Sequence, residues 1–177
     1  MSYKDARGWL TEAERDALYT HALRIGMEPL IVNIGIEYGA SVVCFREASK
    51  LGTIIAIDID ISKYEGEKNV ILVQSDSSRF GHSWGKLTNG KAIDLLFIDG
   101  DHSYGGVVRD LVWTWWLRKG GVVIFHDCYE WPPEPPRTVR AVCPDVDRAV
   151  SEWYSVNKSV YSELETVDSM RVFQRKI

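Results

Sequence analysis

The sequence has no excess of basic residues, since its 21 lysines and arginines are outnumbered by 25 aspartates and glutamates, for a net charge of -4. A chain of this charge has no surplus of cations for a phosphate backbone, which disfavours nucleic acid as the main partner. It also lacks an apolar run near the roughly 20 residues of a membrane span. Residues 1–5 lack the apolar core of a signal peptide. We therefore expect a cytoplasmic protein that does not insert into membranes.

Cysteine is scarce as well, and the three that are present form no pattern. Cys44, Cys128 and Cys143 are odd in number and show no Cys-x-x-Cys spacing. This favours a reducing compartment, argues against a zinc site, and predicts a plain buried or half-buried thiol at each position. The sequence also lacks internal repeats. Its 177 residues, 45% of them hydrophobic, fit one domain over residues 1–177 with a sizeable core.

What the sequence does contain is a series of short, nearly continuous apolar runs, such as Ile31–Ile34 and Val122–Phe125. Such runs are typical of strands that are covered on both faces of a parallel sheet. The predicted strands are residues 30–34, 53–58, 70–74, 92–99 and 121–126. The predicted helices are residues 11–23, 40–49, 104–117 and 145–153, and the predicted closing hairpin is 162–166 with 171–175. This order of elements predicts a three-layer α/β sandwich with a mostly parallel sheet and an antiparallel C-terminal hairpin.

Two of the predicted helices show an apolar face. In the first, Thr11 and Glu14 form a capping box, and one face carries Leu10, Leu18, Tyr19, Ala22 and Leu23. In the third, the apolar stripe at positions 104, 107, 108, 111 and 115 places Trp115 toward the core. Trp113 and Trp116 lie off that stripe. They would either pack under another segment or lie in an interface between copies of the chain, and we expect the interface.

The stretch from Ile31 to Ser41 is the most informative part of the sequence. It has the pattern of a buried strand, a turn with glycine at positions 35 and 39, and the start of a helix, and Asp58 ends the next strand. An acid at that place can accept hydrogen bonds from ribose hydroxyls, as in nucleotide-cofactor sites. Glu37 stands where a dinucleotide fingerprint has glycine, and its charge would repel a pyrophosphate. The turn therefore favours S-adenosylmethionine, which carries no phosphate, over NAD.

Polar side chains also end or follow five predicted strands, at the edge where an open parallel sheet binds its ligands. They are Asn33, Asp58, Asp76, the run Asp99–His102, and His126 with Asp127. A single acid in such a place is usually a strand end or a helix cap. Five polar groups delivered to one edge indicate a binding site instead.

On these residues the chain resembles the class I S-adenosylmethionine-dependent methyltransferases, and within them a small bacterial-type branch of O-methyltransferases. The resemblance is carried by Asn33–Ser41, Gly52–Asp58, Ile93–Tyr104, Arg109–Leu111 and Lys119–Asp127. It implies a Rossmann-like fold and a small-molecule substrate. Asn33 departs from the acid that this family often has, which leaves the site with one charge fewer.

The resemblance also implies roles for individual residues. The turn from Gly35 to Gly39 would lie under the methionine part of the cofactor, and Asp58 would hold the ribose diol. Asp76 and Ser77 would bind the adenine end, and Asp99 would lie near the sulfonium. The implied cofactor-binding residues are Asn33, Gly35, Ile36, Glu37, Gly39, Ser41, Asp58, Ile59, Asp76, Ser77 and Asp99.

The centre of the predicted site is a pair of acids. Asp99 and Asp127 end or follow the fourth and fifth strands, which are neighbours in this fold, so their carboxylates can converge. Converging carboxylates repel one another unless a proton or a cation lies between them. A divalent ion such as Mg²⁺, with His126 as a further ligand, is one solution. In the metal-free alternative, Asp127 pairs with His102 or His126.

The histidines divide into one candidate base and two structural residues. His102 directly follows the fourth strand and could take a proton from a substrate hydroxyl, because histidine titrates at about pH 6.5. It could instead cap the next helix or bond to a backbone carbonyl. Asp99 is the second predicted catalytic residue. His21 and His82, in helix and loop contexts, are expected to be structural.

The proline-rich run Glu130–Pro136 cannot form regular structure, because proline fixes φ and removes a hydrogen-bond donor. We expect residues 129–143 to form a lid loop over the edge of the sheet, with Trp131 as a wall for an apolar substrate. The leading hypothesis is methyl transfer from S-adenosylmethionine to a small molecule, at a hydroxyl oxygen. The alternatives are a cofactor-binding module without catalysis and an NAD-dependent oxidoreductase, which Glu37 disfavours.

Overall fold

In the computed structural model, which describes residues 2–129 and 143–177, seven strands form one sheet. They are β1 (Leu30–Ile34), β2 (Thr53–Asp58), β3 (Ile71–Gln74), β4 (Ile93–Ile98), β5 (Leu117–Phe125), β6 (Tyr161–Val167) and β7 (Met170–Arg175). Their order across the sheet is β3-β2-β1-β4-β5-β7-β6. The first five strands are parallel, and β7 runs antiparallel to both β5 and β6. The predicted mostly parallel sheet with a C-terminal hairpin is confirmed.

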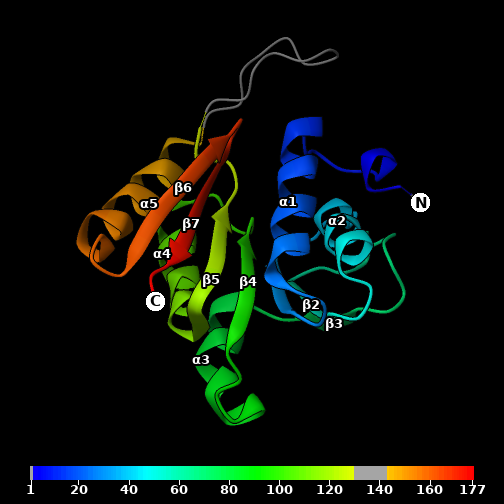
Figure 1. The fold of residues 1–177 in the computed structure, drawn as a ribbon, viewed down its shortest axis with the longest axis horizontal. Helices are drawn as coiled ribbons and strands as arrows, with labels where there is room; N and C mark the ends of the chain where they lie inside the picture. The colour runs from blue at the N-terminus through cyan, green and yellow to red at the C-terminus, as the bar shows by residue number, and fades with distance from the viewer. Residues whose placement is uncertain (1, 130–142) are drawn as a thin grey trace.

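Helices cover both faces of this sheet (Figure 1). The helices are α1 (Glu12–Ile25), α2 (Ala40–Ala48), α3 (Ser77–Thr88), α4 (Tyr104–Asp110) and α5 (Pro144–Asn157), with the 3₁₀ segments η1 (Tyr3–Asp5) and η2 (Leu111–Trp116). Successive residues of β1 face opposite layers. Ile31 packs in one apolar cluster with α1 and α2, whereas Val32 packs in a second cluster with α3, η2 and α5. The three-layer prediction is therefore confirmed.

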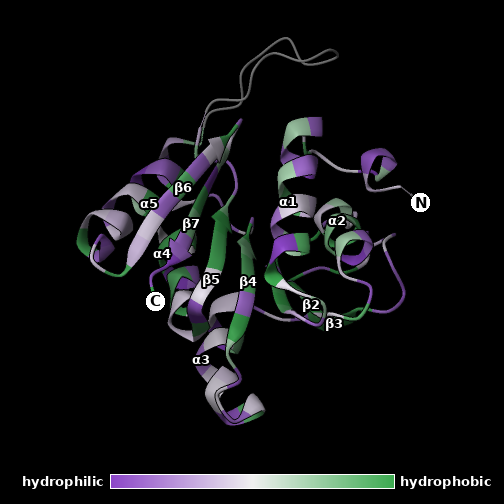
Figure 2. Cartoon of the chain, in the orientation of Figure 1, coloured by the Kyte–Doolittle hydropathy of each residue, from purple (hydrophilic) through white to green (hydrophobic). Residues whose placement is uncertain are grey.

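The apolar character of the central strands explains why they are buried (Figure 2). Every residue of β1 is buried, and so is every residue of β4 except Asp94. The edge strand β3 differs, because Ile71 and Leu72 are 54% and 38% exposed. Among the described residues, none of the helices combines the length and apolar character needed to cross a membrane.

The capping box that begins α1 is present. The Glu14 amide donates to Thr11 Oγ1 at 3.1 Å, and the Thr11 amide donates to a Glu14 carboxylate oxygen at 2.9 Å. The predicted apolar face was wrong in one place, since Leu23 is 55% exposed. The buried residues of α1 instead include three polar side chains, Glu14, Arg15 and His21. These residues interrupted the apolar pattern, and Glu14 and His21 have partners far away in the sequence.

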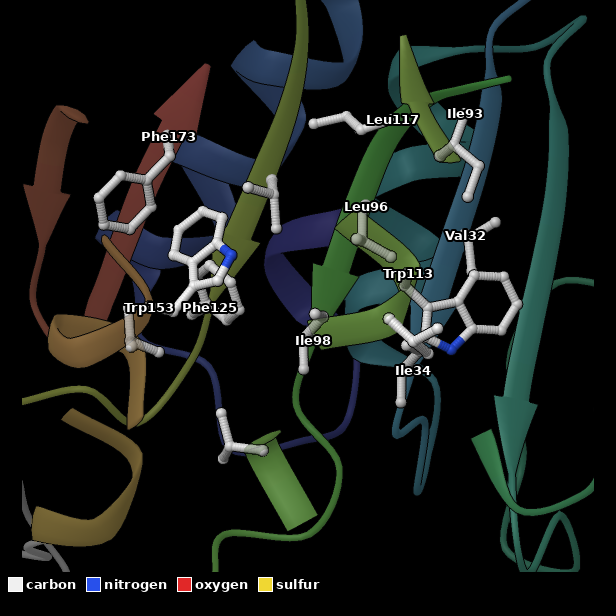
Figure 3. Close-up of a cluster of buried hydrophobic side chains, with 14 of the residues drawn as sticks. Val32, Ile34, Ile93, Leu96, Ile98, Trp113, Leu117, Phe125, Trp153 and Phe173 are labelled. Atoms are coloured by element: carbon white, nitrogen blue, oxygen red, sulfur yellow. The ribbon is translucent and has the colours of Figure 1, made fainter. Parts of the chain in front are cut away.

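The helix predicted to run to Leu117 is α-helical only to Asp110 and continues as the 3₁₀ helix η2. A 3₁₀ helix has three residues per turn, so the positions beyond Asp110 rotate away from an α-helical stripe. As a result Trp115, expected in the core, is 71% exposed. Trp113 is fully buried beside Val32 and Ile34 (Figure 3).

Trp113 and Trp116 both bond within the chain. Their indole nitrogens donate to the carbonyls of Ser77 and Gly81 at 3.0 and 3.1 Å. The expectation that Trp113 lies in an interface between copies is therefore wrong, and the half-buried Trp116 packs against the same core. His82, expected in a loop, lies in α3.

Candidate active site

A cavity of about 920 Å³ opens at the carboxyl ends of the parallel strands, where the predicted site residues lie. This volume is at the upper end of the range for small-molecule sites. The predicted residues that line it are Gly35, Ile36, Glu37, Ser41, Asp58, Ile59, Asp76, Ser77, Asp99, His102, His126 and Asp127. Of the predicted lid, residues 129–143, all but the two end residues lie outside the described part of the chain, and so does Trp131.

The turn after β1 requires glycine for two physical reasons. Gly35 has a φ of 76°, and a Cβ there would lie 1.8 Å from the Asp99 carbonyl oxygen of the next strand. Gly39 has a φ of 95°, and a Cβ there would lie 2.7 Å from the Tyr64 ring. L-residues with side chains rarely adopt these angles. Gly35 thus lets the turn approach the backbone that follows β4, and Gly39 lets the turn pack against Tyr64.

Asp58 fixes the same turn through hydrogen bonds to the backbone. One of its carboxylate oxygens accepts from the Ile36 and Glu37 amides at 2.8 and 3.4 Å, and the other accepts from the Asp60 amide at 3.1 Å. An ionised carboxylate has about four acceptor positions. Asp58 therefore keeps acceptor capacity for a ligand hydroxyl. The Glu37 carboxylate lies 3.6 Å from the Lys63 ammonium.

Asn33, a predicted cofactor residue, is fully buried and is not among the cavity-lining residues. Its side-chain amide donates to the Gly35 carbonyl at 2.8 Å. Gly39, which directly precedes α2, is also not among the cavity-lining residues. Both residues shape the turn and do not face the cavity.

At the far end of the cavity, Asp76 caps the N-terminus of α3. Its carboxylate accepts from the Arg79 amide at 2.9 Å and from the Ser78 hydroxyl at 2.7 Å, and these bonds lower its pKa. The Ser77 hydroxyl donates to a carboxylate oxygen of Asp110. Asp110 lines the cavity and is 3% exposed, and burial raises its pKa to about 6.

No role was predicted from the sequence for Asp110. The available signal was an acid on a predicted helix that lies close to the apolar residues Val107, Leu111 and Val112. Arg109 beside it also lines the cavity.

The centre of the cavity wall is a cluster of two carboxylates and two imidazoles. Nδ1 of His126 lies 3.2 Å from Asp99 Oδ1 and 3.3 Å from Asp127 Oδ2. Nε2 of His102 lies 3.3 and 3.2 Å from the same two oxygens. The carboxylates of Asp99 and Asp127 thus converge at the edge of the sheet, as expected from the order of β4 and β5.

A third carboxylate, that of Glu14 in α1, contacts this cluster. Oε2 of the fully buried Glu14 lies 3.2 Å from Nε2 of His126. The other Glu14 oxygen accepts from the Ser169 amide at 3.0 Å and from its hydroxyl at 2.7 Å. The sequence indicated Glu14 only as a helix cap, because its partners are 112 and 155 residues away.

The charges in the cluster shift one another's pKa values. Burial alone would lower the pKa of His126, but Asp99, Asp127 and Glu14 raise it well above 6.5. The hydrogen bond with Asp99 raises the pKa of His102 against the effect of burial. Burial would raise the pKa of Asp99, yet the two imidazoles hold it below its ordinary value. The cluster therefore favours an ionised Asp99 and protonated imidazoles.

The same atoms suit a divalent cation once His126 is neutral. Asp99, His126 and Asp127 each offer a ligand atom within 4.8 Å of the other two. Bonds of about 2.0–2.1 Å to an octahedral ion separate neighbouring ligands by about 3 Å. The distances of 3.2 and 3.3 Å from His126 Nδ1 to the two carboxylates match this spacing.

Comparison with known proteins identifies a family and a set of similar folds. Residues 32–128 match a family model described as a methyltransferase domain. The chain is also 31% identical over 133 residues to the uncharacterized protein R132 of Acanthamoeba polyphaga mimivirus, an alignment that covers 65% of this chain and 59% of that protein.

Solved structures share the fold at low sequence identity. The MycE methyltransferase of the mycinamycin pathway, in complex with Mg, SAH and mycinamycin VI, has a TM-score of 0.71 and 14% identity over 96% of this chain and 51% of its own. An O-methyltransferase from Bacillus cereus in complex with SAH has a TM-score of 0.68 and 15% identity over 95% and 83%. TomG from Streptomyces achromogenes, in complex with SAM, has a TM-score of 0.68 and 15% identity over 96% and 82%.

The chain therefore spans less than two thirds of R132 and about half of MycE.

Proposed function

The chain belongs to the methyltransferase-domain family, and we propose that it transfers a methyl group from S-adenosylmethionine to a hydroxyl oxygen of a small molecule. The observation that carries this proposal is the single cavity that joins the glycine turn and Asp58 to the cluster of Asp99, His102 and Asp127. One end suits a nucleoside and the other carries acid–base groups. The MycE, TomG and Bacillus cereus structures, which hold SAM or SAH, support the choice of cofactor.

In this proposal the cofactor lies across the ends of β1, β2, β3 and β4. Asp58 accepts hydrogen bonds from the ribose hydroxyls, and Asp76, Ser77 and Asp110 surround the adenine. The Asp99 carboxylate, whose pKa is held low, faces the cationic methionine end. Glu37 adds a negative charge beside the turn, which a sulfonium and an ammonium tolerate and a pyrophosphate does not.

Methyl transfer is an in-line displacement, so the protein mainly aligns donor and acceptor and removes the proton of the hydroxyl. His102 is placed for this step, because its side chain is 46% exposed at the cavity wall and bonds to Asp99 and Asp127. The two carboxylates raise its pKa, so the imidazole becomes available as a base as pH rises. Turnover should therefore increase with pH through that raised pKa.

Asp99, His126 and Asp127 would hold a divalent cation beside this base. A bound cation would lower the pKa of the acceptor hydroxyl. Glu14 would keep the Nε2 proton of His126 in place and leave Nδ1 free to bind the ion.

Titration calorimetry tests the cofactor assignment. S-adenosylhomocysteine should bind and NAD should not. Asp58→Ala should weaken binding by roughly 1–3 kcal/mol, the usual result of removing a hydrogen-bond partner. Asp60→Ala is the matched control, since Asp60 does not line the cavity and should change affinity little. Heat with NAD and none with S-adenosylhomocysteine would refute the proposal.

Turnover tests the acid–base assignment. His102→Gln should lower the rate by a factor of roughly 10²–10⁴ at unchanged cofactor affinity. His82→Gln, an exposed histidine of α3 outside the cavity, should leave the rate unchanged. Equal rates in the two variants would remove His102 from the reaction.

A further inference from the structure

We propose that the cavity binds a second class of cation, a borderline-soft divalent ion of the zinc type, through His102, Asp127 and Cys143. These three residues each offer a ligand atom within 4.8 Å of the other two. They follow β4, follow β5 and precede α5, so they meet only in the folded chain. This site does not require methyl transfer, and it can be tested with metal ions alone.

The distances suit zinc. Sγ of Cys143 lies 3.9 Å from Nδ1 of His102. Bonds of about 2.0 Å to nitrogen and 2.3 Å to sulfur at the tetrahedral angle place such atoms about 3.5 Å apart. Small side-chain movements close the remaining difference. Cys143 is half-buried, so its thiol is accessible without unfolding.

The chemistry of the ligands separates this group from the one built on Asp99, His126 and Asp127. Thiolate and imidazole are preferred by Zn²⁺, whereas Mg²⁺ prefers oxygen ligands and gains little from sulfur. Asp127 belongs to both groups, so the ions compete for that carboxylate. The sequence argued against zinc because it lacks paired cysteines, but one cysteine with a histidine and an acid meets the requirement for three protein ligands.

The surroundings hold these ligands in place and leave room for a fourth. Nε2 of His102 lies 3.3 Å from Asp99, which is outside the ligand group, so Asp99 can orient the imidazole while the other ring nitrogen binds metal. All three residues line the 920 Å³ cavity. A site with three protein ligands and an open fourth position is the arrangement of catalytic zinc. A cation here would occupy His102 and exclude its role as a base.

Cobalt titration of the whole chain, without cofactor or acceptor, tests the proposal. Co²⁺ bound by a thiolate gives a strong near-ultraviolet charge-transfer band, which oxygen and nitrogen ligands do not produce. We expect a saturable band that one equivalent of Zn²⁺ abolishes and a large excess of Mg²⁺ does not. Cys143→Ser should abolish the band and weaken Zn²⁺ binding by more than about 10-fold, since even loss of an outer contact costs that much.

Cys44→Ser is the matched control, because Cys44 is a fully buried thiol away from the cavity, and it should keep the band. His82→Gln, which removes an exposed histidine outside the cavity, should also keep it. Circular dichroism without metal checks that each variant folds. A band that survives in Cys143→Ser, or one that Mg²⁺ displaces as readily as Zn²⁺, would overturn the proposal. Neither result bears on methyl transfer, which the calorimetric experiment tests separately.

Discussion

Glu14 is a fully buried acid that joins three parts of the molecule. It completes the capping box of α1, accepts two hydrogen bonds from Ser169 in the turn of the C-terminal hairpin, and faces His126. Burial would raise its pKa, but the bonds with His126, Ser169 and Thr11 hold the pKa below its ordinary value. The charge on Glu14 is therefore part of the folded state.

Glu14→Gln should destabilise the chain by roughly 3 kcal/mol, the usual effect of breaking a buried charge pair. Glutamine replaces one acceptor oxygen with a donor, which must then face an amide or the imidazole. Urea unfolding measures the loss. Glu12→Gln in the same turn of α1, with a side chain that is 75% exposed, should change stability by less than about 0.5 kcal/mol. Equal stability of the two variants would contradict the role assigned to Glu14.

Asp110 gives the chain a pH-dependent stability. Its pKa is about 6 in the folded chain and 3.8 ordinarily, so the folded state binds the proton more tightly. Its contribution is stabilising below pH 3.8 and is lost as pH rises through about 6. A shift of about two units corresponds to about 3 kcal/mol. The groups around it are the Ser77 hydroxyl and the charges of Asp76, Arg109 and Asp101.

Asp110→Asn should stabilise the chain at pH 8 by up to about 3 kcal/mol, because asparagine keeps the bond from Ser77 without an ionisable group. At pH 4 the variant and the wild type should be about equally stable. Urea unfolding at the two pH values gives the comparison, with Asp60→Asn, an exposed acid of low pKa that does not act on Asp110, as the control. A constant difference across pH would show that Asp110 is not the group that titrates.

At the scale of elements, η2 shows where periodicity fails. The sequence predicted one α-helix, but the chain forms a 3₁₀ helix after Asp110. As a result Trp113 is buried and Trp115 is exposed, the reverse of the prediction. The cause is tertiary, because Trp113 and Trp116 bond to carbonyls of α3. The helix α3 was itself missed, since glycine, serine and histidine dilute its apolar face.

Trp113→Ala should therefore destabilise the chain by roughly 3–5 kcal/mol, as for other buried large side chains. Trp115→Ala, at the 71% exposed position, should cost less than about 0.5 kcal/mol. Thermal or urea unfolding of both variants measures the two losses of stability. A larger loss for Trp115→Ala than for Trp113→Ala would contradict the 3₁₀ helix and favour a continuous α-helix.

The turn from β1 into α2 was predictable from the sequence, because its positive φ angles require glycine at positions 35 and 39. Gly35→Ala places a Cβ 1.8 Å from the Asp99 carbonyl, so β1 and β4 must separate. We expect a loss of several kcal/mol and loss of cofactor binding. Gly105→Ala in α4 would bring a Cβ to 3.5 Å from the Arg109 guanidinium, an ordinary contact distance, and should be neutral or stabilising by up to about 1 kcal/mol. Calorimetry with S-adenosylhomocysteine measures the effect. Normal binding of this ligand by Gly35→Ala would refute the prediction.

Over the whole molecule, the sequence predicted the parts that depend on local patterns. The apolar runs marked β1, β2, β4 and β5, and the convergence of Asp99 with Asp127 followed from the order of those strands. Contacts distant in sequence were not predictable. The bond from Glu14 to Ser169 joins two ends of the chain, and the approach of Cys143 to His102 depends on how α5 docks. A single sequence carries no signal for either pair.

The last prediction concerns the molecule as one cooperative unit. Glu14 and Ser169 tie α1 and the C-terminal hairpin to the strand ends that line the cavity, so a ligand there should stabilise all the layers together. S-adenosylhomocysteine at about 100 times its dissociation constant should add about 2.7 kcal/mol. That corresponds to a rise of roughly 5–10 °C in the melting temperature at this chain length.

Far-ultraviolet and tryptophan signals should shift equally, since Trp113 and Trp153 report the core on the opposite face from α1. Asp58→Ala at the same ligand concentration should show a smaller shift. Separate transitions for the two signals would show that the site stabilises only its own edge of the sheet.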